Sequence, residues 1–306
     1  CYNLRERGGI RMRDFNYSKL REQKWDSNVV GLIAAIYKYA GKQELYLKQR
    51  PDELEKLVEI AKIQSTEASN AIEGIITTNT RIKQLVEEKT TPKNRDEEEI
   101  AGYRDVLNII HESFDVIPIS KNYILQLHKI LYSHMNNPIA GRTKSVQNYI
   151  SATYPDGHTE ILFTPLAPYE TPEALEKICA EYNKVIGNFE VEPLIAIPVF
   201  IHDFLCIHPF NDGNGRMSRL LTTLLLYRSG FISFGARVSF LLIIGAFFVY
   251  CILRISDKFF PNWTIKTNFI WILYPFCMMI SVILGYFYNS GSNLWLLLND
   301  IFYNRI

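Results

Sequence analysis

The residue types that phosphate chemistry requires are concentrated in one twelve-residue segment, residues 208–219. The segment reads His-Pro-Phe-Asn-Asp-Gly-Asn-Gly-Arg-Met-Ser-Arg. Its Gly213-Asn214-Gly215 stretch precedes a helical pattern, and the two glycines allow backbone N–H groups to converge on an anion at the start of a helix. The segment therefore predicts a loop that binds phosphate.

The charged side chains of this segment complete the chemistry. A neutral imidazole at His208 can take a proton from an attacking hydroxyl. Asp212 offers a hard carboxylate oxygen to a Mg²⁺ ion that bridges phosphates. Arg216 and Arg219 are three residues apart, which predicts that they share a helix face and bind the same polyphosphate. A lone histidine or a lone Gly-Asn-Gly is usually structural, and their combination with these groups indicates a catalytic site.

Two core helices are predicted to hold this loop. Residues 193–206 are almost wholly apolar, which is typical of a central helix buried on all sides. A second helix is predicted from Arg216 to Gly230, where the glycine provides a C-terminal stop. Just before the loop, His202 and Asp203 are predicted to orient the buried helix rather than to react.

The region from residue 12 to about residue 140 is predicted to be mostly helical. Apolar residues at helical spacing indicate individual helices over residues 52–63, 79–88, 97–112, 122–134 and 172–185. The acidic run 96–99 is predicted to be a solvated helix N-terminus, which the helix dipole favours. His111, His128 and His134 have no ligand-like partners, and we predict ordinary surface or core histidines.

A hairpin is predicted within residues 145–165. Pro155-Asp156-Gly157 lies between β-forming residues, and proline fixes one backbone dihedral while glycine accepts a positive one. Taken alone, this pattern predicts a surface hairpin without a functional role.

Residues 208–219 resemble the motif of the Fic family, His-Pro-Phe-x-(Asp/Glu)-Gly-Asn-Gly-Arg-x-x-Arg, at every position. The resemblance extends over about residues 12–230. It implies a mainly α fold, a Fic-type helical core with a β-hairpin flap. It also implies MgATP as substrate, transfer of AMP to a Tyr, Thr or Ser hydroxyl of a target protein, and release of pyrophosphate.

The same resemblance implies roles for individual residues. They are His208 as general base, Asp212 as Mg²⁺ ligand, Gly213, Asn214, Gly215, Arg216 and Arg219 as ATP- and phosphate-binding residues, and Phe210 as a packing anchor. The hairpin would be the flap that aligns the target's backbone by strand addition, with its edge at Tyr149, Ile150, Ser151 and Ala152. A phosphorylating branch of the family has lysine where this chain has Gly215, which favours adenylylation here. Members that transfer UMP or phosphocholine share the motif.

Residues 69–74, Ser-Asn-Ala-Ile-Glu-Gly, resemble the family's inhibitory motif, (Ser/Thr)-x-x-x-Glu-(Gly/Asn). Ser69 and Glu73 are four residues apart on one helix face, and Gly74 can end that helix. A carboxylate placed there could pair with Arg219 and occupy the position that the γ-phosphate needs. We therefore expect an autoinhibited enzyme. Two alternatives stay open, an inactive nucleotide-binding regulatory module and an enzyme that removes AMP.

Composition limits the partners and the compartment. The 33 basic and 32 acidic residues nearly balance, so no nucleic-acid partner is evident. Five scattered cysteines without a CxxC pair and the lack of a secretory signal favour a cytoplasmic catalytic domain. A homodimer stays open as well, because dimers are common in the family.

The C-terminal part of the chain has a different composition. Residues 238–306 contain six charged residues, against 59 in residues 1–237. Uncharged runs over 238–253 and 269–288 approach the length that spans a bilayer. This hydrophobic tail is either a membrane anchor formed by residues 238–288 or the product of a frameshift. The predicted division is thus an N-terminal helical region with the inhibitory motif (12–110), a Fic domain (111–237) and the tail (238–306).

Overall fold

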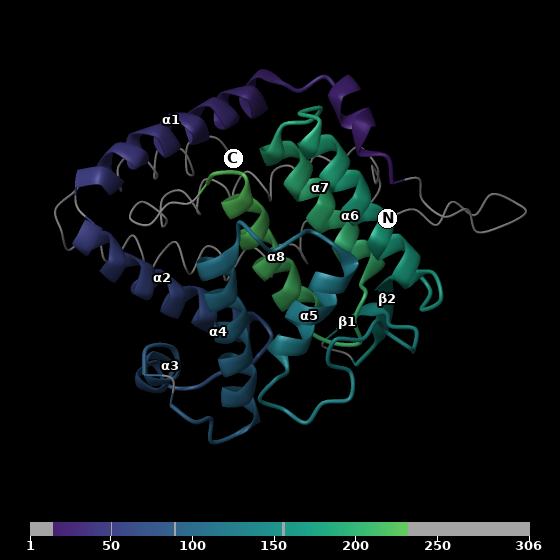
Figure 1. Cartoon of the computed structure of the whole chain (residues 1–306). Helices are drawn as coiled ribbons and strands as arrows, with labels where there is room; N and C mark the ends of the chain where they lie inside the picture. Colours follow the sequence, from purple (N-terminus) through teal and green to yellow (C-terminus); the bar gives the residue numbers. More distant parts are fainter. Residues whose placement is uncertain (1–14, 50, 89, 155–156, 232–306) are drawn as a thin grey trace, which may run out of the picture.

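The computed structural model describes residues 15–49, 51–88, 90–154 and 157–231. The described part is mainly helical with one two-stranded sheet, as predicted (Figure 1). In chain order the elements are η1 (Tyr17–Glu22), α1 (Ser27–Gln49), α2 (Pro51–Ile72), α3 (Asn79–Val86), α4 (Arg95–Ser113), α5 (Lys121–Leu131), β1 (Ile150–Thr153), β2 (Thr159–Phe163), α6 (Thr171–Gly187), α7 (Pro193–Ile207) and α8 (Asn214–Arg228).

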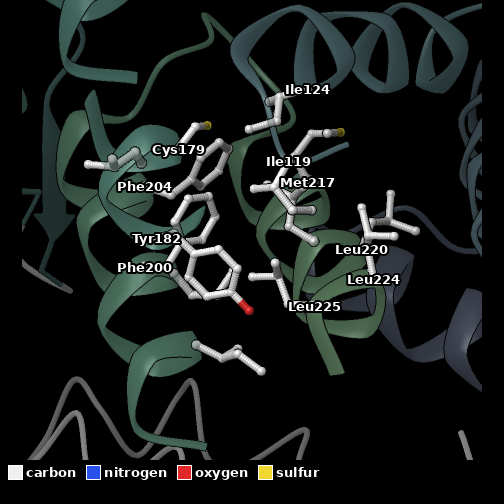
Figure 2. Packing of buried hydrophobic residues seen from close by; sticks show 14 of the residues in the cluster. Ile119, Ile124, Cys179, Tyr182, Phe200, Phe204, Met217, Leu220, Leu224 and Leu225 are labelled. Carbon is white, nitrogen blue, oxygen red and sulfur yellow. The ribbon is translucent and has the colours of Figure 1, made fainter. Parts of the chain in front are cut away.

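The core lies where α7 packs between α6 and α8 (Figure 1). Phe200 and Phe204 of α7 are fully buried, and Figure 2 shows their rings with Tyr182 of α6 beside Met217 and Leu225 of α8. Burial of each such side chain contributes about 2 kcal/mol. The prediction of a central apolar helix is confirmed, and this core fixes the two helix ends between which residues 208–213 run.

Helices α4 and α5 form a close pair, in which α4 packs on α8 and α5 packs on α6. The pair can approach closely because Gly102 lies against the backbone of Leu131, so that a Cβ atom at residue 102 would overlap the Leu131 carbonyl oxygen. This contact places the end of α5 beside the start of α8, where the phosphate-binding loop is predicted.

The first two helices, α1 and α2, bring the chain to the N-terminal part of α8 as well. Helix α2 packs on α4 and α8, which puts its C-terminal end beside α8 (Figure 1). Helix α1 is tied to the core by Tyr37, whose hydroxyl donates to the Glu192 carboxylate at 2.6 Å and whose ring lies 5.3 Å from that of Phe231. The predicted division at residue 110 remains a prediction, and α4 runs through it without a break.

The acidic run at the start of α4 corrects one prediction, because two of its four carboxylates, those of Glu97 and Glu99, are buried rather than solvated. Glu97 is buried and forms an ion pair with Arg81 at 2.9 Å, and the hydrogen bond from Arg81 lowers the Glu97 pKa. Glu99 is also buried and lies 2.7 Å from Arg216 of α8. The helix dipole explains why carboxylates begin this helix, but the basic partners on α3 and α8 explain why they are inside.

No helix in the described ranges is long and apolar enough to cross a membrane. The predictions for the tail, residues 238–306, fall outside the described residues.

Replacing Gly102 with alanine should destabilise the protein strongly, because the added Cβ would meet backbone that cannot yield. We expect Gly102→Ala to lower the free energy of unfolding by about 3 kcal/mol, measured by urea denaturation. The control is Gly31→Ala on α1, where a Cβ meets nothing within 4 Å. That variant should gain about 0.5 kcal/mol from helix propensity, and equal effects of the two changes would contradict the close approach of α4 and α5.

Candidate active site

The predicted loop joins α7 to α8 through two left-handed backbone positions. His208 caps α7 with φ at +51°, and Gly213 precedes α8 with φ at +80°. Gly213 adopts this conformation without steric cost, whereas a non-glycine residue does not. The His208 backbone N–H still donates to the Phe204 carbonyl at 2.9 Å, so the turn begins while the last helical hydrogen bond is intact.

Asn214 holds the loop closed with its side chain. Its Oδ1 accepts from the Phe210 N–H at 2.9 Å, and its Nδ2 donates to the Phe210 carbonyl at 2.7 Å. Asn148 donates to the same carbonyl at 3.1 Å. The Asn214 side chain is buried and engaged in these bonds, so a ligand can meet this residue only through its backbone. The sequence motif names Asn214 but does not reveal this structural role.

Phe210 anchors the loop by packing, as expected. Its ring is fully buried and stacks on the His128 ring with centroids 3.7 Å apart and planes 5° from parallel. His128 Nδ1 accepts from the Gly141 N–H at 3.0 Å, so the proton of this neutral ring is on Nε2, which donates to the Asp212 carbonyl at 3.1 Å. His128 is thus a core histidine, and its spacing in the sequence gave no sign that it supports the loop.

His208 is half-buried in a state suited to accept a proton. Its Nδ1 donates to the Leu205 carbonyl at 3.3 Å, which leaves Nε2 with a free lone pair. Burial lowers the His208 pKa, the Leu205 hydrogen bond opposes this, and the Lys144 charge lowers it further. The imidazole is therefore neutral at neutral pH, which is the form that a general base requires.

Lys144 connects the base of the hairpin to the end of α7. The side chain is buried, and its Nζ donates to the Ile207 carbonyl and to Asn148 Oδ1, both at 3.0 Å. Its backbone N–H donates to the Pro209 carbonyl at 2.8 Å. Burial lowers the Lys144 pKa to about 8. A lysine here satisfies a carbonyl that the helix leaves without a partner.

The two arginines of the motif have different surroundings. Arg216 is 1% exposed, and its guanidinium donates to Glu99 at 2.7 Å and to the Tyr132 hydroxyl at 2.9 Å. The Arg219 side chain is 30% exposed and lies beside the end of α2. The two groups therefore do not converge on one exposed position, contrary to the expectation from their spacing, because α4 supplies a buried partner for Arg216. A phosphate-binding role for Arg216 stays a prediction.

The predicted inhibitory residues lie beside Arg219. Its Nε donates to Ser69 Oγ at 2.7 Å, and one of its terminal nitrogens donates to Glu73 Oε1 at 2.7 Å. Helix α2 ends at Ile72, and Gly74 follows Glu73 with φ at +78°. A Cβ atom at Gly215 would collide with Glu73 Oε1, so this carboxylate lies directly against the N-terminal turn of α8.

Asp212 presents its carboxylate at the surface next to the same turn. Its side chain is 53% exposed, and Oδ2 lies 3.6 Å from an Arg216 nitrogen. Within the described part of the chain, no group of three or more His, Cys, Asp or Glu residues is placed to hold a metal. A single exposed carboxylate fits Mg²⁺ in the mode where phosphates and water supply most of its ligands.

The hairpin forms as predicted, with β1 and β2 antiparallel and an irregularity between Ile150 and Ser151. Ile150, Ser151 and Ala152 lie on β1, and Tyr149 precedes it. In the described residues β1 pairs with β2 alone, so its outer edge offers unpaired backbone groups to an added strand.

His202 and Asp203 lie in the last two turns of α7, before the loop begins. Asp203 is buried, and its Oδ2 accepts from the Tyr17 hydroxyl at 3.1 Å, while Oδ1 lies 3.3 Å from His202 Nδ1. These contacts fit the expectation that the two residues orient the helix.

Comparison with known proteins points to the same region of the chain. The model of the Fic/DOC family matches residues 118–226. The protein adenylyltransferase Fic of Nematostella vectensis is 27% identical over 186 residues, which are 58% of this chain and 40% of that protein. The protein adenylyltransferase fic-1 of Caenorhabditis elegans is 31% identical over 113 residues, 37% of this chain and 20% of that protein. The chain therefore spans less than half the length of these curated relatives.

A solved structure gives the same result for the fold. A Fic domain containing signaling protein from Bacteroides thetaiotaomicron superimposes with a TM-score of 0.55 at 25% sequence identity. The match covers 72% of this chain and 81% of the other. It therefore includes helices outside the region that the family model matches.

The buried histidine under the loop predicts a pH dependence of stability. Burial lowers the His128 pKa from 6.5 to about 4, so the unfolded chain takes up the proton first as the pH falls. The contribution of neutral His128 to the free energy of unfolding is about 3 kcal/mol. It is fully present above about pH 6.5 and is lost as the pH falls toward 4. Urea denaturation across this range should show a shallower pH slope for His128→Phe than for the parent protein. Equal slopes would contradict a buried neutral imidazole.

Proposed function

Residues 118–226 form a Fic/DOC domain, and on this premise we propose that the chain is a protein adenylyltransferase. It moves AMP from ATP to a hydroxyl group of a target protein. The observation that carries the proposal is the loop itself, which places a neutral His208 and the exposed Asp212 carboxylate directly before the N-terminus of α8. Curated relatives of this region are named protein adenylyltransferases, which supports the same activity.

In the proposed reaction, His208 Nε2 accepts the proton of the target's hydroxyl as its oxygen attacks the α-phosphorus of ATP. A bond forms between that oxygen and phosphorus, the bond from the α-phosphorus to the oxygen bridging to the β-phosphate breaks, and pyrophosphate leaves with the electron pair. The N–H groups at the start of α8 and the guanidinium of Arg219 hold the phosphates. Asp212 would be the protein ligand of Mg²⁺, which neutralises phosphate charge when bound.

The target would bind along the hairpin. The open edge of β1 at Ile150–Thr153 offers backbone hydrogen bonds to an extended segment. The hairpin's base is tied to the loop through Lys144 and Asn148, so a segment added there has a fixed position relative to His208. Strand addition recognises the backbone of the target and not its side chains. A Tyr, Thr or Ser hydroxyl could therefore each be the acceptor.

Glu73 would inhibit this activity in the conformation described. Its carboxylate lies at the start of α8 and is bound by Arg219, where it takes the place of a phosphate oxygen of ATP. An anion already bound there excludes the γ-phosphate from the same donors by occupancy and by charge. ATP would then bind in a pose that does not align its α-phosphorus with His208.

Removing this carboxylate should activate the protein. We expect Glu73→Gly to raise self-adenylylation, measured as radiolabel transferred from α-labelled ATP. A change of about 1.4 kcal/mol in the free energy of displacing Glu73 corresponds to about a tenfold change in rate, and we expect at least this much.

Two controls give this measurement its meaning. Adding His208→Ala to Glu73→Gly should abolish transfer, because no base remains. Glu67→Gly on the same helix removes an acidic residue that lies outside the inhibitory motif and should leave the low activity unchanged. If Glu73→Gly binds ATP and transfers no label, the chain is a nucleotide-binding module rather than a transferase.

The pH profile of the activated form tests the role of His208. Burial holds its pKa below 6.5, and a base is active when deprotonated, so kcat/KM should rise with pH and level off with a midpoint below 6.5. Loss of Glu73 lowers this midpoint further, because that carboxylate raises the His208 pKa. A midpoint at or above 6.5 in Glu73→Gly would contradict the assignment.

A further inference from the structure

We propose that the residues at the end of α5, His128 and Tyr132, are positioning residues that fix the Asp212 carboxylate for Mg²⁺. The inference rests on the proposed function, in which Asp212 is the metal's protein ligand. The two residues are four apart in the sequence. His128 contacts the backbone of Asp212, and Tyr132 contacts the arginine that faces its carboxylate.

His128 fixes the backbone of Asp212. Its Nε2 donates to the Asp212 carbonyl at 3.1 Å, and its Nδ1 is held by the Gly141 N–H at 3.0 Å. The ring is clamped flat against Phe210, with centroids 3.7 Å apart. The imidazole therefore has one orientation and one tautomer, and the carbonyl bound to it cannot rotate freely.

Tyr132 acts on the side chain of Asp212 through Arg216. Its hydroxyl accepts from a terminal nitrogen of Arg216 at 2.9 Å, and Oδ2 of Asp212 lies 3.6 Å from the same nitrogen. Arg216 in turn is held by Glu99 at 2.7 Å. A series of polar contacts thus runs from Glu99 on α4 through Arg216 to the exposed carboxylate of Asp212.

The loop is shaped to admit this hydroxyl. A Cβ atom at Gly213 would lie 3.0 Å from the Tyr132 oxygen and 3.3 Å from its ring, so a larger residue would press on Tyr132. The positive φ of Gly213 also turns the chain so that Asp212 lies outside and α8 begins inside. The Gly213 N–H donates to Asp212 Oδ1 at 2.6 Å, and Oδ2 faces Arg216 at 3.6 Å. Without a fixed Arg216, the second oxygen of this 53% exposed carboxylate loses its partner and the side chain can turn about its last bond. Partners that orient a metal ligand commonly change metal affinity about tenfold or more.

The test separates metal binding from nucleotide binding. Using the full chain with Glu73→Gly, we would measure by calorimetry the affinity for α,β-methylene ATP with Mg²⁺ and with EDTA. We expect Tyr132→Phe to reduce the gain in affinity due to Mg²⁺ about tenfold and to leave the affinity in EDTA unchanged. His128→Phe should act in the same direction, whereas His128→Gln, which keeps a donor for the carbonyl, should lose less.

Two comparisons exclude a merely structural effect. Tyr182→Phe removes the hydroxyl of another buried tyrosine, on α6, and should leave the gain from Mg²⁺ unchanged. In an Asp212→Asn background, Tyr132→Phe should cause no further loss, because the carboxylate that it positions is gone.

Other outcomes would overturn the inference. If Tyr132→Phe weakens binding equally in Mg²⁺ and in EDTA, or changes neither affinity, Tyr132 does not position a metal ligand. If the Glu73→Gly protein itself binds no nucleotide in either condition, the proposed function fails, and that result is distinct because it appears before any change on α5.

Discussion

Residues 208–213 turn the chain between two buried helices, and backbone polar groups at such a place must find hydrogen-bond partners away from water. The loop has no regular structure to supply these partners, so side chains supply them. Asn214 and Asn148 bind the backbone of Phe210, Lys144 binds the Ile207 carbonyl, and His128 binds the Asp212 carbonyl. The loop's shape is therefore set by four side chains from three segments of the chain, and the positions of His208 and Asp212 depend on it.

This constraint separates two kinds of residue within one short motif. Phe210, Asn214 and Arg216 face the core, where they pack, close the loop and neutralise Glu99. Asp212 is exposed, and His208 and Arg219 are half-buried, so these three side chains lie at the surface, although Arg219 is bound to Ser69 and Glu73. A motif of this length is specific because it encodes both the support and the chemistry. The contact between Gly102 and Leu131 belongs to the support as well, since it brings α5 under the loop.

The sequence was sufficient for the fold class, the central helix, the hairpin and the loop between two core helices, because periodicity and turn residues act locally. It also placed Glu73 opposite Arg219, through the resemblance of residues 69–74 to a known motif. It was insufficient where long-range partners decide the outcome. Glu97 and Glu99 were predicted to be solvated, because nothing near them in the sequence indicates that Arg81 and Arg216 form ion pairs with them in the fold. His128 read as ordinary for the same reason, since Gly141, Phe210 and Asp212 meet it only in the folded chain.

The connection of α2 to the rest of the chain has a consequence for how inhibition would behave. Glu73 lies at the end of α2, and α2 is joined to α4 by a short linker and α3. Glu73 and Arg219 therefore meet within one molecule. An intramolecular partner acts at an effective concentration set by the chain, and dilution does not change it. Inhibition by Glu73 would therefore be independent of protein concentration, and a separate peptide with the same residues would need millimolar amounts to replace it. A small shift of the end of α2, about the width of one carboxylate, would remove Glu73 from Arg219 and end the inhibition.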